Sequence, residues 1–279
     1  MIRQPRTLPV PVLLLVVVLA LAACGGGSTP ATTSEPGATP VAGSTAAPAA
    51  TSGSEAATAA PAASPADGGI DIGGAAASLE NLDNYSFKIE MKAEGGSEFM
   101  MVPAGGSLVM EGDVILKPTE AVDVTMTTND GTTASVLGYR IIGDTAYINL
   151  GGDSWMSAPA DDAASAVDSF KPDQMLGSYS SLEGLSKVGE EDKNGIPSEH
   201  YSSTSDPGIG SMFGLPGATW TSDVWIAKDG GYVVSAAITA TGKSEAGKQG
   251  TFVMTVDVTG ANDPNLVIEP PTNLTEMPG

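Results

Sequence analysis

Few side chains in this sequence are of the kinds that usually do catalysis or bind metals. Cys24 and His200 are the only cysteine and the only histidine among 279 residues. One cysteine cannot close an intrachain disulfide, and the pair cannot supply the four soft ligands of a zinc or iron–sulfur site. His200 follows the hairpin signal Asn194-Gly195, and Glu199 beside it points to the other face of the same strand. We therefore interpret His200 as a histidine at a sheet surface or edge.

Carboxylates are abundant, but their spacing is not that of an active site. Asp161 and Asp162 are adjacent, as are Glu190, Glu191 and Asp192. Such groups can act as acids and bases or bind calcium, yet none of these has the spacing of a calcium loop, and no Gly-x-Ser-x-Gly elbow precedes a helix. The sequence predicts a protein that is not an enzyme and that has no cofactor and no metal.

The charge of the chain limits its partners. It has 12 basic against 33 acidic residues, a formal net charge of −21. Phosphate backbones and anionic lipid headgroups repel a protein this acidic, which argues against nucleic-acid binding. We expect partners that are neutral, apolar or cationic.

The N-terminus has the features of a secretion signal that ends in a lipidation site. Arg3 and Arg6 precede an apolar run from Pro9 to Ala22, which is too short for a comfortable membrane span. The run ends in Leu21-Ala22-Ala23-Cys24-Gly25, which resembles the bacterial lipobox. That motif predicts a signal peptide over residues 1–23 and acylation of Cys24, which would anchor the protein to the extracytoplasmic face of the cell membrane. The alternative is an ordinary secretory peptide with a cysteine at this position.

The next segment has the composition of a tether. Between residues 25 and 69 only Glu35, Val41, Glu55 and Asp67 are not Ala, Gly, Pro, Ser or Thr. Such a segment buries too little apolar surface to offset its ordering entropy. We therefore predict a lipidated cysteine and disordered tether over residues 24–69 and one folded domain over 70–279.

The folded part has the alternation typical of half-buried strands. Tyr85, Phe87, Ile89 and Met91 alternate with polar residues, and the same period recurs along the chain. A short helix is expected near 75–82 and two more between Pro159 and Leu185. We predict an α+β fold in which nine or ten antiparallel strands form one large curved sheet with helices packed on one face. The expected strands lie near residues 85–91, 108–117, 122–127, 134–142, 145–150, 186–191, 198–203, 220–228, 232–240 and 252–258.

Methionines recur on the apolar faces of these strands, where β-branched residues are more usual. Methionine is flexible and adapts to irregular apolar ligands, so these positions favour a soft apolar cavity with the 159–185 helices as its lid. The alternative is that they simply fill the core. The residues expected to line the cavity are Met91, Met110, Leu116, Val124, Met126, Met175, Leu176, Tyr179, Ile238 and Met254.

At this point the chain resembles a family. The lipobox, the tether and three phrases in order, Gly143–Ile148, Gly195–Tyr201 and Val224–Val234, are similar to the LppX/LprAFG family of bacterial lipoproteins over about residues 75–260. That family is related in fold to the lipoprotein carriers LolA and LolB. The resemblance implies an open half-barrel with helices on its concave apolar face, and a ligand that is a lipid or lipoglycan. The long tether and the segments Glu98–Met101 and Gly210–Phe213 depart from the family pattern.

Two functions follow from these observations. The first is a membrane-anchored envelope lipoprotein that binds a lipid or other apolar ligand and carries or presents it within the cell envelope. The second is a structural or sensory envelope lipoprotein whose acidic surface binds a basic protein partner.

Overall fold

The computed structural model describes residues 70–95, 102–162, 168, 171–177, 184–205 and 214–275. The predicted signal peptide, Cys24, the tether and Tyr179 lie outside these residues, as do Glu98–Met101 and Gly210–Phe213. None of the helices described is long and apolar enough to cross a membrane.

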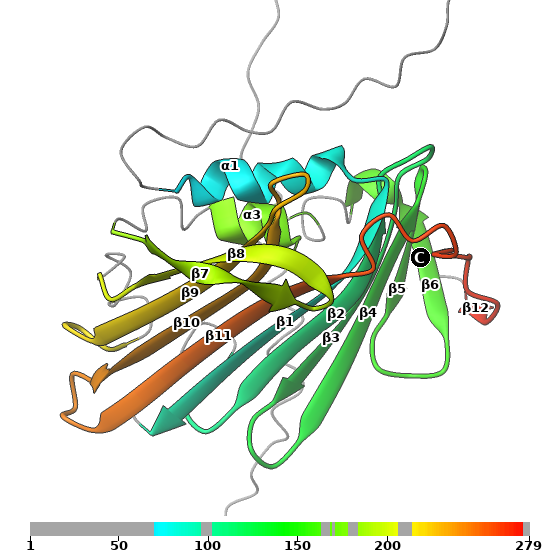
Figure 1. Cartoon of the computed structure of the whole chain (residues 1–279). Helices are drawn as coiled ribbons and strands as arrows, with labels where there is room; N and C mark the ends of the chain where they lie inside the picture. Colours follow the sequence, from blue (N-terminus) through cyan, green and yellow to red (C-terminus); the bar gives the residue numbers. More distant parts are fainter. Residues whose placement is uncertain are drawn as a thin grey trace, which may run out of the picture. The chain divides into compact units, whose positions relative to one another are not determined.

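The described part of the chain is built on one curved, open sheet (Figure 1). Its twelve strands follow the order β12-β6-β5-β4-β3-β2-β1-β11-β10-β9-β8-β7. The strands are β1 (Asn84–Gly95), β2 (Ser107–Ile115), β3 (Ala121–Asn129), β4 (Ala134–Ile142), β5 (Thr145–Asn149), β6 (Trp155–Pro159), β7 (Ser186–Lys193), β8 (Ile196–Ser203), β9 (Thr219–Ala227), β10 (Val233–Lys243), β11 (Gln249–Thr259) and β12 (Leu274–Thr275). The predicted curved sheet is confirmed.

Two details of the prediction are wrong. The sequence pattern gives ten strands and does not give β6 or β12, because β6 follows a Gly-rich run and β12 has only two residues. The pairing is also not wholly antiparallel, since β12 runs parallel to β6.

Within the described residues, four short helical segments accompany the sheet. They are α1 (Ile72–Ala77), η3 (Ser78–Asn81), η4 (Ala160–Asp162) and α3 (Pro172–Gly177). The Asp71 carboxylate accepts a hydrogen bond from the Gly74 N–H at 3.0 Å, which caps α1. In α3, Pro172 takes the first helical position and Asp173 lies in the first turn.

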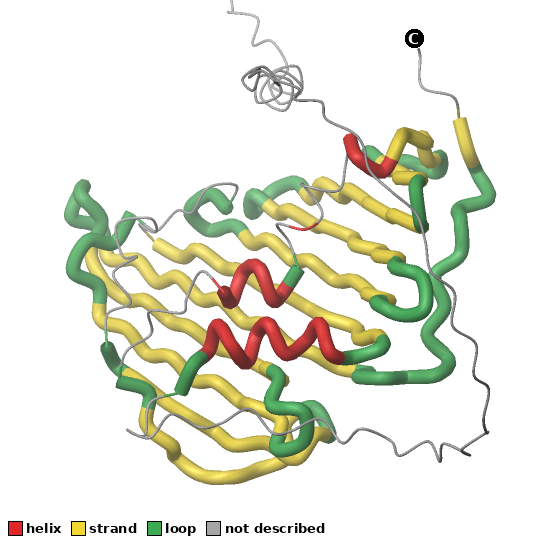
Figure 2. The backbone as a smooth tube through the Cα atoms, turned by 90° about the horizontal axis from the view of Figure 1, so that it is seen from above, coloured by secondary structure: helices red, strands yellow, loops and turns green. Residues whose placement is uncertain are grey.

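The helices α1 and α3 lie across one face of the sheet (Figure 2). We call this the inner face; in β1 it carries Tyr85, Phe87 and Ile89, which are at most 3% exposed. The opposite, outer face carries polar residues such as Ser86 and Lys88. The alternation of one buried and one wet face is the pattern that the sequence predicts.

Inner-face side chains and helix side chains form one core. Ile72, Ala76 and Leu79 from α1 and η3 belong to the same buried cluster as Phe252 and Ile238 of the sheet. Each large apolar side chain buried in this way contributes about 1.5–3 kcal/mol to stability. The helices are too short to be stable alone, so this packing holds them in place.

Candidate functional site

The sequence-predicted cavity residues come together on the inner face. Seven of them are at most 5% exposed and belong to the one buried cluster, and two more, Leu116 and Met175, are partly buried and pack against it. The seven are Met91, Met110, Val124, Met126, Leu176, Ile238 and Met254. Their role in ligand binding stays a prediction.

Strand register explains how residues distant in sequence meet. Met110 lies opposite Met126 in the β2–β3 pair, and Met254 lies opposite both Met91 of β1 and Ile238 of β10. Leu176 of α3 joins the same cluster from the helix layer. The inner face therefore carries a methionine-rich strip that spans strands β3 to β10 under the helices.

The apolar inner face continues beyond this strip onto β4, β5 and β6. Leu137 lies opposite Met126, Tyr139 lies opposite Val124, and Ile148 lies opposite Tyr139. Leu137, Tyr139 and Ile148 are only partly buried, in contrast to the strip. We call this half-open extension of the inner face, with Ile141 of β4 and Met156 of β6, the open flank.

The open flank was missed by the choice of candidate residues from sequence. The alternation of Leu137, Tyr139 and Ile141 marks a strand with one apolar face, and the same signal is present in Ile148 of the next strand. The alternation cannot show how far these side chains are shielded from solvent, because that depends on where the helices lie on the sheet.

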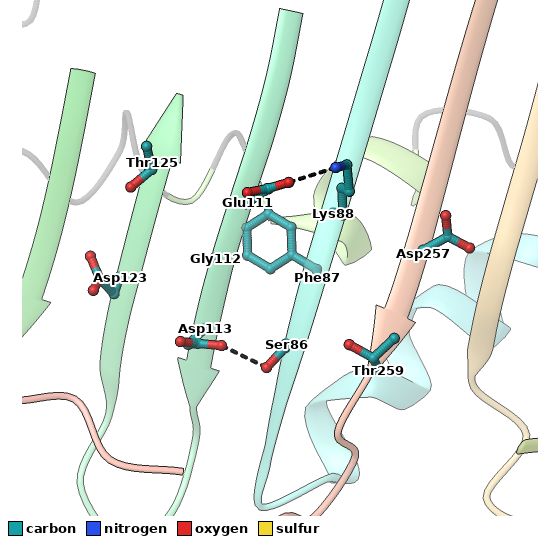
Figure 3. Close-up of a pocket in the computed structure, with 10 residues that line it drawn as sticks. All are labelled: Ser86, Phe87, Lys88, Glu111, Gly112, Asp113, Asp123, Thr125, Asp257 and Thr259. Carbon is teal, nitrogen blue, oxygen red and sulfur yellow. Dashed lines mark hydrogen bonds and ion pairs between the residues drawn. The ribbon is translucent and has the colours of Figure 1, made fainter. Parts of the chain in front are cut away.

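The outer face has a cleft of about 410 Å³ over β11, β1, β2 and β3 (Figure 3). Most of the charged groups in its lining pair with neighbouring side chains. The Ser86 hydroxyl donates to the Asp113 carboxylate at 2.6 Å, and the Lys88 ammonium pairs with the Glu111 carboxylate at 2.6 Å. Asp123, a further lining residue, pairs with Arg140 of β4. These cross-strand pairs are the ordinary way in which a wet sheet face is stabilised.

A glycine beneath this cleft holds an aromatic ring in place. Gly112 of β2 lies opposite Phe87 of β1, and a Cβ at this position would lie 2.9 Å from the Phe87 ring. Figure 3 shows the ring lying across the backbone at Gly112. The absence of a side chain therefore lets Phe87 pack flat in the core.

His200 lies on the outer face of β8, as a sheet histidine, with Glu199 on the opposite face. Its ring stacks on Trp225 with centroids 4.4 Å apart. Its Nδ1 lies 3.3 Å from Glu191 and its Nε2 lies 3.0 Å from Asp223. Because both ring nitrogens face carboxylates, neither is placed to take a proton from a serine or threonine hydroxyl.

An ion-pair network occupies the inner side of the β7–β8 hairpin. Lys187 pairs with Glu190 at 2.9 Å and with Glu199 at 2.7 Å, and Glu190 also pairs with Lys228. Hydrogen bonds from Lys228 and then Lys187 lower the pKa of Glu190 to about 2. Burial and the hydrogen bond to Glu199 raise the pKa of Tyr201 to about 12. This edge of the inner face is therefore polar, unlike the open flank at the other edge.

A second cavity, of about 300 Å³, opens at one end of the helix layer. It is lined by η3, α3 and the chain segments that begin β1 and connect β2 to β3. Leu116, one of the sequence-predicted residues, lines it, together with acidic and basic side chains. Over the described residues, no group of three or more histidine, aspartate and glutamate side chains is placed to hold a metal ion.

Comparison with known proteins gives one kind of match. No family model and no curated protein sequence matches the chain. Among solved structures, the chain is similar to LprF from Mycobacterium bovis, with a TM-score of 0.42 and 13% sequence identity. The match covers 70% of this chain and 93% of the LprF chain.

Proposed function

We propose that this protein is a membrane-anchored lipoprotein that binds a lipid or another apolar ligand on its inner face and carries or presents it within the cell envelope. The observation that carries the proposal is the continuity of the apolar inner face. It is sealed by helices over the methionine-rich strip and is half-open over β4, β5 and β6. A ligand's acyl chain would enter at the open flank and displace the short helices from the strip.

Two properties of the inner face support this proposal. Soft methionine side chains can repack around an acyl chain. Helices of six residues, α1 and α3, are held mainly by their apolar contacts, so an apolar ligand can replace those contacts at small cost. In this proposal the helices lie on the concave face of the sheet, as the resemblance to the LppX/LprAFG lipoproteins implies.

The anchor is the second part of the proposal. Acylation of Cys24 would hold the protein on the extracytoplasmic face of the membrane, and the 24–69 tether would let the domain leave and return to it. As a flexible coil, this segment has a root-mean-square span of about 35–40 Å. The net negative charge would keep the domain off anionic headgroups, so that contact with the membrane would be made through the ligand.

Two neighbouring residues of β4 give a matched test of ligand binding. Leu137 points to the inner face, and Val136 points to the outer face, where it is 44% exposed. We expect Leu137→Asp to reduce binding of a fluorescent fatty acid to the full-length chain by about tenfold or more, because it places a charge on the path of the acyl chain. Val136→Asp adds the same charge on the other face and should leave binding unchanged.

Circular dichroism of both variants controls for folding. Equal binding by Leu137→Asp and the unsubstituted chain would contradict entry over the open flank. The unsubstituted chain and both variants could all fail to bind the fatty acid. If a basic protein partner that is released at high salt were then recovered with the chain, the result would favour the protein-binding function.

A further inference from the structure

The cavity at the end of the helix layer differs from the rest of the inner face because charged groups line it. Glu80 comes from η3, Asp173 from α3, and Lys171 from the residue that precedes α3. Tyr85, the second residue of β1, lines the cavity beside them. The cavity therefore brings titratable groups from separate elements to one place.

The two basic side chains of the cavity are already neutralised. The Lys171 ammonium lies 2.9 Å from the Glu120 carboxylate and 2.9 Å from that of Asp168. Burial opposes its charge, but these two hydrogen bonds outweigh burial and hold the pKa of Lys171 above its ordinary value. Lys117 pairs with Asp83 at 3.1 Å. Neither lysine is left with an unopposed charge for an anionic ligand.

One carboxylate oxygen of the cavity lining lacks a hydrogen-bond partner within the described residues. Asp173 Oδ1 is buried and has no hydrogen-bond partner among the described residues, although its Oδ2 accepts from Gln174 at 2.9 Å. The side chain of Tyr85 is 2% exposed and lines the same cavity. A buried acceptor without a partner is unfavourable, so a ligand that donates a hydrogen bond to Asp173 Oδ1 would be stabilised there.

The carboxylates that line the cavity, Glu80, Glu120 and Asp173, outnumber its two lysines. Burial is the main cause that raises the pKa of Tyr85, and the negative charges of Asp173, Glu80 and Glu120 raise it further. The same three carboxylates line the cavity. An anion would be repelled at the Tyr85 hydroxyl, and a cation would be attracted there.

We propose that this cavity binds the primary ammonium group of an amphipathic ligand whose acyl chains lie on the inner face. A primary ammonium has three N–H donors, enough for Asp173, Tyr85 and the exposed carboxylate of Glu80 together. This inference rests on the proposed lipid binding and adds the class of headgroup.

The cavity and the open flank adjoin each other. Leu116 lines the cavity and packs against the core, and Glu120 immediately precedes β3. Val122, two residues further along β3, lies opposite Ile141 of the open flank. A headgroup in the cavity would thus leave the acyl chains at the start of the apolar path.

Lipids with matched acyl chains test the headgroup. Native mass spectrometry of the full-length chain would measure binding of dioleoyl phosphatidylethanolamine, phosphatidylcholine and phosphatidylglycerol. We expect phosphatidylethanolamine to bind about tenfold more tightly than the other two, because choline has no N–H donor and glycerol has no cation. Asp173→Asn and Tyr85→Phe should each reduce this preference.

Asp229→Asn provides the matched control, because it makes the same change of charge at an exposed turn outside the cavity and should keep the preference. Equal binding of the three lipids by the unsubstituted chain would overturn the headgroup inference and leave lipid binding intact. An unchanged preference in both Asp173→Asn and Tyr85→Phe would also overturn it. Binding of none of the lipids would contradict the proposed function itself.

Discussion

The two flanks of the sheet share an apolar inner face but differ in how it is covered. On β9, β10 and β11, inner-face residues such as Val224, Ile238 and Phe252 are at most 1% exposed. On β4 and β5, the equivalent residues Leu137 and Ile148 are only partly buried. Both flanks have the same sequence alternation, so the difference arises from the layer above the sheet.

This difference separates stability from binding. A fully covered apolar side chain gains transfer energy and packing contacts in the free protein. A partly exposed apolar side chain has lost less contact with water and retains apolar surface that a ligand can cover. We therefore expect substitutions on the covered flank to affect folding most, and those on the open flank to affect binding most.

The largest expected effect on stability is a cavity in the covered flank. Ile238→Ala should reduce the free energy of unfolding by about 2–5 kcal/mol, because tightly packed neighbours cannot refill the space. Leu137→Ala on the open flank should cost less than half as much. Urea unfolding followed by circular dichroism measures both, and equal costs would show that the two flanks are packed alike.

A smaller effect is expected where a glycine admits a ring. Gly112→Ala should reduce the free energy of unfolding by about 1–3 kcal/mol, because the new Cβ would lie 2.5 Å from the backbone carbonyl oxygen of Asp123 and 2.9 Å from the Phe87 ring. Gly189→Ala in the edge strand β7 is the matched control, since a Cβ there meets no atom within 4 Å. A control that is as destabilised as Gly112→Ala would refute the packing argument.

The smallest effect is expected at the polar edge formed by β7 and β8. The pKa of Glu190 is about 2 in the folded state against an ordinary value of 4.5, because Lys228 and Lys187 donate hydrogen bonds to its carboxylate. A lowered pKa means that the carboxylate favours the folded state above about pH 4.5 and that this contribution is lost as the pH falls through about 2.

Carbon-detected NMR of the Glu190 carboxyl group gives its titration midpoint. We expect the Lys228→Met variant to move that midpoint upward, toward the ordinary value. Because the pair is exposed, overall stability near neutral pH should change little in this variant. If the midpoint were the same with and without Lys228, the ion pair would not be the cause of the lowered pKa of Glu190.

The sequence predicts which face of the sheet each side chain lies on better than it predicts which strands pair with each other. Alternation places Met91, Met110, Met126 and Met254 on the apolar faces of their strands, and the structure confirms this placement. It cannot show that β1 pairs with β11, because that contact joins segments more than 150 residues apart and local periodicity carries no information about partners.

The polar cavity was not predictable for a related reason. Tyr85 looks like any other inward aromatic residue of an alternating strand, and Asp173 looks like a helix cap. Only the folded arrangement of the chain brings the two together with Glu80 around one cavity. A site assembled from single residues of separate elements leaves no motif in the sequence.

The most direct test of the central claim is to extract and identify what the full-length protein holds when it is purified from its native host. We predict an acylated lipid that is retained by the unsubstituted protein and by Val136→Asp, and that is lost from Leu137→Asp. Protein that is folded and lipid-free in all three cases, and that binds no added lipid, would contradict the claim.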